Sequence, residues 1–134
     1  MVIKEISIGE ALPIRQKAMW PDESMDFVKV EGDEKAVHLG LLLDRKLISV
    51  VSIFGTGEVV QFRKFGTLPD YQKRGFGSKL LVYLIGFLKE RSVKKIWCNA
   101  RTERVDFYEG FGFTATTKTF FKTGKEYVIM EMEL

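Results

Sequence analysis

The chain has 134 residues, which is most simply one domain with a substantial hydrophobic core. Hydrophobic residues make up 46% and charged residues 29% of the chain, proportions that exclude a disordered protein. The formal net charge is only +3 and the basic residues are scattered. This argues against a nucleic-acid partner but suits a small anionic ligand.

Cysteine content and hydropathy indicate the compartment. Cys98 is the only cysteine, so no disulfide can form within the chain, and we interpret it as a small buried hydrophobe. The chain begins without an apolar signal segment, and no apolar run approaches the length of a membrane span. We therefore expect a cytoplasmic protein with no membrane partner and no metal site, either a monomer or a homodimer.

The N-terminal part predicts strands, one helix and one irregular segment. In chain order the expected elements are a strand over 2–8, a helix over 9–19, an irregular segment over 20–35 and strands over 36–43 and 47–54. The last of these is an unbroken apolar run, typical of a strand buried on both faces. Between the two last strands, Asp44, Arg45 and Lys46 predict a three-residue hairpin loop.

The C-terminal part alternates strands and helices. In chain order we expect a strand over 59–68, a helix whose apolar face runs from Leu80 to Leu88, a strand over 93–100, a helix over 102–110 and a hairpin of strands over 113–122 and 125–133. Thr102 is expected to cap the short helix. The elements together predict one α/β domain over 1–134, with a mixed, mostly antiparallel central sheet of about seven strands and helices on both faces.

Residues 65–81, FGTLPDYQKRGFGSKLL, lead from a strand into the long helix through basic residues and two glycines. Unpaired amides and partial positive charge at a helix N-terminus suit a phosphate, and glycine lets a bulky anion approach the backbone. The stretch does not fit the Walker pattern, which needs four residues between the first glycine and Gly-Lys-Ser/Thr. It does not fit G-x-G-x-x-G either, because Leu80 occupies the third glycine position. A plain turn remains the alternative, although two glycines and three polar residues exceed what a turn requires.

The remaining pattern, Q-x-x-G-x-G from Gln72 to Gly77 after Thr67-Leu68-Pro69, resembles the GCN5-related N-acetyltransferase (GNAT) superfamily, which binds acetyl-CoA. VDFYEGFGF over 105–113 resembles that family's A-x-x-F-Y-x-x-x-G-F segment, and WCNAR with the closing hairpin resembles the ElaA-like subgroup. The resemblance implies the GNAT fold. It also implies acetyl transfer from acetyl-CoA to a primary amine of a small molecule or peptide, by direct attack in a ternary complex.

The resemblance further implies a set of cofactor contacts, in which the loop amides hold the pyrophosphate and pantetheine pairs with backbone between two splayed strands. The implied coenzyme A contacts are Phe65, Gly66, Thr67, Gln72, Lys73, Arg74, Gly75, Phe76, Gly77, Ser78, Lys79, Asn99 and Arg101. The family often has Asn where Arg101 stands, so Arg101 could instead reach a CoA phosphate or an acidic acceptor. Phe65 could equally belong to the core.

Tyr108 is the predicted catalytic residue. Attack of an amine on a thioester expels a thiolate, and a phenol beside the sulfur can protonate it. Family members often use a tyrosine at this place. The alternative is that Tyr108 packs on the cofactor without transferring a proton.

No general base is evident, although an acceptor ammonium must lose a proton before it attacks. Many relatives use a Glu on the strand before the glycine loop, where this chain has Gln61-Phe62-Arg63. Glu58, His38 (the only histidine) and water remain as candidates.

Trp20, His38 and Arg63 are the candidate acceptor-side residues, and Arg15 could join Trp20 at the acceptor mouth. Arg63 interrupts an apolar strand, so it needs a partner, either an acid such as Asp26 or an anionic acceptor. A rival interpretation is a non-catalytic acyl-CoA-binding module, which the missing strand Glu favours.

Overall fold

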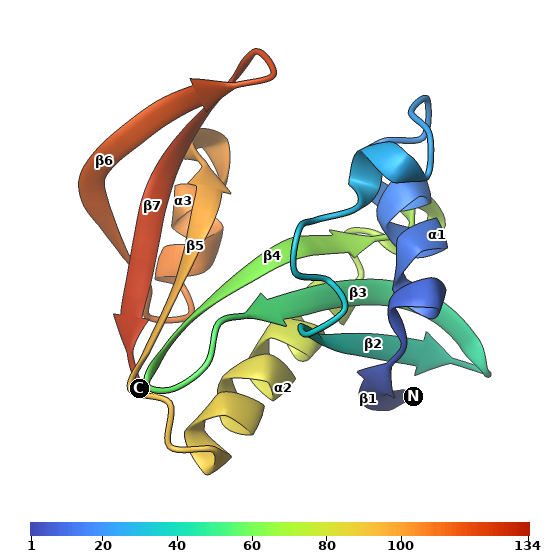
Figure 1. Ribbon diagram of the computed structural model, residues 1–134, viewed down its shortest axis with the longest axis horizontal. Coiled ribbons are helices and arrows are strands. Elements are labelled where there is room, and N and C mark those ends of the chain that lie inside the picture. Colours follow the sequence, from blue (N-terminus) through green and yellow to red (C-terminus); the bar gives the residue numbers. More distant parts are fainter.

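The computed structural model describes residues 1–134 and contains a single seven-stranded sheet (Figure 1). Its strands are β1 (Val2–Ile6), β2 (Val37–Leu43), β3 (Lys46–Phe54), β4 (Val59–Thr67), β5 (Lys95–Arg101), β6 (Thr114–Lys122) and β7 (Lys125–Glu133). Their spatial order is β1-β2-β3-β4-β5-β7-β6, and only β4 and β5 run parallel. The predicted mixed, mostly antiparallel α/β sheet is confirmed.

Helices cover both faces of the sheet. They are α1 (Ile8–Met19), α2 (Phe76–Glu90) and α3 (Val105–Glu109), with 3₁₀ turns at Asp26–Val28, Pro69–Tyr71 and Thr102–Arg104. Alternation along β3 sends Val50 into the cluster under α1 and Val51 into the larger cluster under α2. None of the helices combines the length and the apolar composition that crossing a bilayer requires.

Three local details differ from the sequence prediction. The β2–β3 loop has two residues, Asp44 and Arg45, both in the left-handed region, because this turn matches the twist of the strands. Thr102 caps nothing: a 3₁₀ turn starts there and the α3 N-terminus has no side-chain cap. Ser7 and Glu10 form an unpredicted capping box, which starts α1 at residue 8.

The sheet forks between its two parallel strands. β4 and β5 pair only from Val59–Gln61 to Lys95–Trp97. Beyond these residues β4 stays paired with β3 and β5 with β7, and the two halves of the sheet diverge (Figure 1). The backbone between the diverging strands is therefore free to meet a ligand, at the place where the sequence predicts splayed strands.

A β-bulge interrupts β4 at the fork. Val50 faces Gly66 and Ser52 faces Arg63, so Lys64 and Phe65 together oppose one residue of β3. Lys64 has a φ of 56°, which is uncommon for a residue with a side chain. The bulge adds one residue to β4 opposite β3, and no pattern in the sequence indicates it.

Candidate functional site

The fork opens into a cleft of about 650 Å³ bordered by the end of α1, β4, the glycine loop, β5, α3 and the β6–β7 hairpin. The residues predicted from the sequence that line it are Trp20, Arg63, Phe65, Gly66, Thr67, Gln72, Lys73, Gly75, Phe76, Gly77, Ser78, Asn99, Arg101 and Tyr108. The fold thus brings together residues that are up to 88 positions apart in the chain. Arg74, Lys79 and His38 do not line the cleft.

The start of α2 presents free backbone donors to the cleft. The first hydrogen bond of this helix runs from the Lys79 amide to the Gly75 carbonyl, and no side chain caps the N-terminus. The amides of Phe76, Gly77 and Ser78 therefore have no acceptor within the protein. Together with the partial positive charge of the helix end, they form a site suited to a phosphate group.

The two loop glycines serve different needs. Gly75 has a φ of 84° with no atom within 4 Å of the position a Cβ would take, so it supplies the left-handed turn and leaves open space in front. At Gly77 a Cβ would lie 3.4 Å from Cζ of Phe65, so this glycine lets the helix start pack against β4.

Side-chain hydrogen bonds attach the loop to the strands. The Gln72 amide group donates to the Thr67 carbonyl oxygen at 2.9 Å. The Ser49 hydroxyl donates to the Gly66 carbonyl oxygen at 3.1 Å and also bonds the Thr67 hydroxyl. These bonds consequently fix the position of the glycine loop, with its free amides, relative to the end of β4.

Arg74 and Lys79 lie on the outer side of the loop. The Arg74 guanidinium lies 5.3 Å from the centre of the Phe76 ring and 5.5 Å from that of Tyr71. The Lys79 ammonium lies 6.0 Å from the Phe76 ring centre. Both side chains add positive charge near the helix start, but neither borders the cleft.

Tyr108 lines the cleft at the edge of an aromatic cluster. Its ring centre lies 5.9 Å from that of Phe62 and 5.8 Å from that of Phe113. Burial, reinforced by the neighbouring Cys98 thiol and partly offset by Arg104, raises the pKa of the Tyr108 phenol well above its ordinary value. The phenol is protonated at neutral pH and can donate a proton or a hydrogen bond into the cleft.

Cys98 also borders the cleft but is buried. Burial raises the pKa of its thiol to about 12. Since the thiolate is the nucleophilic form, Cys98 is a poor nucleophile, which agrees with its expected role as a small buried hydrophobe.

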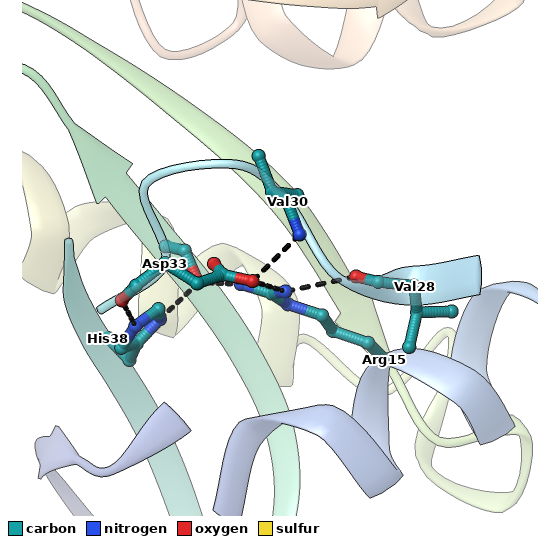
Figure 2. A network of polar contacts seen from close by, with 6 residues as sticks. Arg15, Val28, Val30, Asp33 and His38 are labelled. Carbon is teal, nitrogen blue, oxygen red and sulfur yellow. Dashed lines mark hydrogen bonds and ion pairs between the residues drawn. The ribbon is translucent and has the colours of Figure 1, made fainter. Parts of the chain in front are cut away.

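His38 lies in a buried polar network outside the cleft (Figure 2). Its Nε2 bonds the Asp33 carbonyl oxygen at 2.9 Å and its Nδ1 bonds the Ser52 hydroxyl at 2.7 Å. Arg15 is fully buried and makes two 2.8 Å hydrogen bonds to the Asp33 carboxylate. Both ring nitrogens of His38 are occupied, and neither His38 nor Arg15 reaches the acceptor mouth where the sequence places them.

The other proposed acids and bases are also elsewhere. Glu58 is exposed at the far end of β4 and does not border the cleft. The expected pair between Arg63 and Asp26 is not formed, because the Asp26 carboxylate bonds Lys29 at 2.9 Å. Arg63 instead lies 5.9 Å from the centre of the Phe54 ring. No aspartate or glutamate lines the cleft.

Several lining residues were not singled out from the sequence. The principal ones are Lys64, Arg104, Phe120, Lys122 and Tyr127. Phe120 and Tyr127 stack with ring centres 5.3 Å apart, across the hairpin. The pairing of the two strands follows from the Thr123-Gly124 turn, but no sequence signal indicates that this hairpin borders the cleft.

Sequence comparisons give one family and one kind of relative. A family model described as an acetyltransferase (GNAT) domain matches residues 16–134. The ribosomal protein bS18 alanine N-acetyltransferase of Salmonella typhimurium LT2 is 26% identical over 120 residues, covering 87% of this chain and 80% of that protein. The protein of the same name from Escherichia coli K12 is 38% identical over 52 residues, which are 37% of this chain and only 35% of that protein.

Solved structures share the fold along nearly the whole chain. The ribosomal-protein-S18-alanine N-acetyltransferase of Escherichia coli has a TM-score of 0.82 at 22% identity, covering 98% of this chain and 92% of that one. A GNAT acetyltransferase from Elizabethkingia anophelis with acetyl-CoA bound has a TM-score of 0.79 at 16% identity, covering 99% and 97%. Escherichia coli ElaA has a TM-score of 0.76 at 15% identity, covering 99% and 100%. With the family model matched over residues 16–134, the chain belongs to the acetyltransferase (GNAT) domain family.

Proposed function

We propose that this chain transfers the acetyl group of acetyl-CoA to the primary amine of a small molecule or peptide, by direct attack in a ternary complex. The observation that carries the proposal is the cleft itself. It contains both the unpaired backbone amides at the start of α2 and the protonated phenol of Tyr108, and it lies at the gap between β4 and β5. A reducing cytoplasm remains the compartment we expect.

The residues present fit acetyl-CoA. The free amides of Phe76, Gly77 and Ser78, with Lys73 beside them, would hold the diphosphate. The backbone of Phe65, Gly66 and Thr67 borders the gap and would accompany the pantetheine arm. Acetyl-CoA would supply the acetyl group as a thioester, an activated acyl donor.

Tyr108 would act as the general acid. Its phenolic Oη holds a proton at neutral pH and would donate it to the leaving sulfur as the carbon–sulfur bond breaks and the carbon–nitrogen bond forms. No carboxylate or imidazole borders the cleft to accept the ammonium proton, so we assign that proton to solvent water. The second proton, which the nitrogen loses as the amide forms, would return to the Tyr108 phenolate and restore the phenol. Cys98 would form no acyl-enzyme, because its thiol stays protonated.

The direct experiment mixes the purified chain with acetyl-CoA and a panel of amines and follows the release of free thiol. We expect release that depends on both the protein and the amine. Titration with CoA in the same buffer measures binding separately.

A non-catalytic acyl-CoA-binding module is the second candidate, and one observation favours it: the cleft lacks any carboxylate that could serve as a base. This module would bind CoA in the titration yet release no thiol with any amine. Tyr108 favours the enzyme over the module, because a binding module needs no proton donor in the cleft.

A further inference from the structure

All the charged side chains that line the cleft are basic. Its charged lining residues are Arg63, Lys64, Lys73, Arg101, Arg104 and Lys122, and none is acidic. A cleft lined by cations alone concentrates anions and repels cations. Coenzyme A is itself anionic, so the question is which of these side chains would lie near its phosphates.

Arg63 is remote from the phosphate site. Because of the bulge, the four steps from Arg63 to Thr67 in β4 span three residues of β3, or about 10 Å, on the side away from the glycine loop. Lys122 stands at the turn of the β6–β7 hairpin, also outside that loop. Lys73, by contrast, lies within the loop that precedes α2.

Arg63 also approaches the fork from the opposite face of the sheet. Its neighbour Phe62 belongs to the core cluster under α2, so strand alternation directs Arg63 toward α1. Its cross-strand partner is Ser52, whose hydroxyl accepts a 2.9 Å hydrogen bond from Arg15 of α1. Tyr108 packs against Phe62 on the α2 side. An acceptor that enters past Arg63 would therefore approach the thioester from the α1 face of the sheet, whereas Tyr108 lies on the α2 face.

Three cations that line the cleft form no ion pair within the protein. None of the four ion pairs of the structure includes Arg63, Lys64 or Lys122. The Asp33 carboxylate acts on Lys64 electrostatically, but both of its oxygens accept hydrogen bonds from Arg15. These three side chains thus remain available to a ligand.

Lys64 lies in a region of predominantly positive charge. Burial, followed by the charges of Arg63, Arg15 and Lys122, lowers the pKa of its ammonium, and the charge of Asp33 offsets this only in part. The bulge fixes its backbone in the left-handed region at the same place. A carboxylate bound among these cations would relieve their mutual repulsion.

We propose that the acceptor carries a carboxylate close to its amine, and that Arg63, Lys64 and Lys122 bind this carboxylate. The inference rests on the proposed acetyl transfer. An arginine fork matches a carboxylate with two hydrogen bonds, and the lysines add charge. Trp20, Phe120 and Tyr127 would contact the body of the acceptor. Polyamines and basic N-terminal peptides are excluded by repulsion.

Binding of the acetylated product class tests the carboxylate site without turnover. The CoA-saturated protein is titrated with N-acetyl-L-glutamate, with its uncharged diamide, and with a short N-acetylated peptide of acidic residues. We expect N-acetyl-L-glutamate or the acidic peptide to bind at least about tenfold more tightly than the diamide. Comparing the affinities of N-acetyl-L-glutamate and the acetylated peptide distinguishes a small-molecule acceptor from a peptide acceptor. Equal affinity for the acid and the diamide would overturn the inference.

Charge variants complete the test. Arg63→Gln and Lys64→Gln should each abolish the preference for the acid and leave CoA affinity unchanged, whereas Lys73→Gln should weaken CoA and keep the preference. Lys89→Gln removes an exposed charge from the far end of α2 and is the matched control. Retention of the preference in both Arg63→Gln and Lys64→Gln would reject the site. Failure of thiol release with intact acid binding would reject only the acetyl transfer.

Discussion

The side-chain amide of Gln72 donates a 2.9 Å hydrogen bond to the carbonyl oxygen of Thr67, the last residue of β4. This bond closes the segment that runs through the 3₁₀ turn Pro69–Tyr71. It joins the strand edge proposed to accompany pantetheine to the amides proposed to hold the diphosphate. The two halves of the cofactor site are thereby held in register before any ligand arrives, which lowers the cost of ordering them on binding.

Replacing Gln72 by alanine should therefore weaken CoA binding without unfolding the protein. The lost hydrogen bond is exposed, so we expect the dissociation constant measured by calorimetry to rise about 3- to 10-fold. Gln16→Ala is the matched control, because the Gln16 amide makes a comparable exposed bond to the Glu23 carbonyl oxygen away from the loop. An equal effect of both substitutions on CoA affinity would contradict a specific role for Gln72.

A carboxylate placed at Gly75 should block the phosphate site. Any side chain at this φ of 84° costs stability, about 1–2 kcal/mol, but the Cβ meets no other atom, so the fold should survive. Gly75→Glu and Gly75→Gln share that strain and nearly the same shape. We expect CoA to bind Gly75→Glu at least about tenfold more weakly than Gly75→Gln, because only the glutamate repels phosphate. Equal dissociation constants would mean that no phosphate lies there.

Tyr108→Phe should separate chemistry from binding. The phenylalanine keeps the packing against Phe62 and Phe113 but removes the proton donor. We expect kcat to fall about a hundredfold or more while CoA affinity stays within a factor of about two. Tyr83→Phe, at an exposed position of α2, controls for the loss of a hydroxyl. Unchanged kcat in Tyr108→Phe would reduce Tyr108 to a packing residue.

The parts of the molecule governed by local patterns were predictable from the sequence. Apolar runs locate all seven strands within a few residues, and the spacing of Leu80, Leu84 and Leu88 identifies the buried face of α2. The glycine loop was predictable for the same reason: a short stretch of sequence sets both its turn and its free amides. Tyr108 reaches the cleft because α3 is short and packs on Phe113, only five residues later.

The rest depends on contacts between distant segments. The bulge at Lys64 lies in the part of β4 that is no longer paired with β5 but is still paired with β3. The residue pattern of β4 alone does not indicate it. His38 has the composition of a candidate base, yet Asp33 and Ser52 occupy both its nitrogens after folding. Arg63 lacks the expected acid because Asp26 lies in a turn next to Lys29. Which face of the fork each cation lines follows only from the strand register.

The buried pair of Arg15 and Asp33 should dominate the stability of the α1 side of the sheet. Arg15 is fully buried and also donates to the Val28 carbonyl oxygen at 3.0 Å (Figure 2). Asp33→Asn leaves this charge without a counter-ion, so we expect the free energy of unfolding to fall by about 3–5 kcal/mol in urea titrations at pH 7. Asp26→Asn removes an exposed pair and should change it little.

The same pair sets a dependence on pH. Burial alone would raise the pKa of the Asp33 carboxyl, but hydrogen bonds from Arg15 and from the Val30 amide outweigh it and lower the pKa below its ordinary value. A lowered folded pKa means that the carboxylate stabilises the fold above its unfolded pKa, near 3.9, and that this contribution is lost as pH falls through the folded value. The gap in unfolding free energy between the wild type and Asp33→Asn should thus be constant from pH 7 to pH 5 and narrow below pH 4. A gap that stayed constant down to pH 2 would show that the charge of Asp33 is not what holds Arg15 in the core.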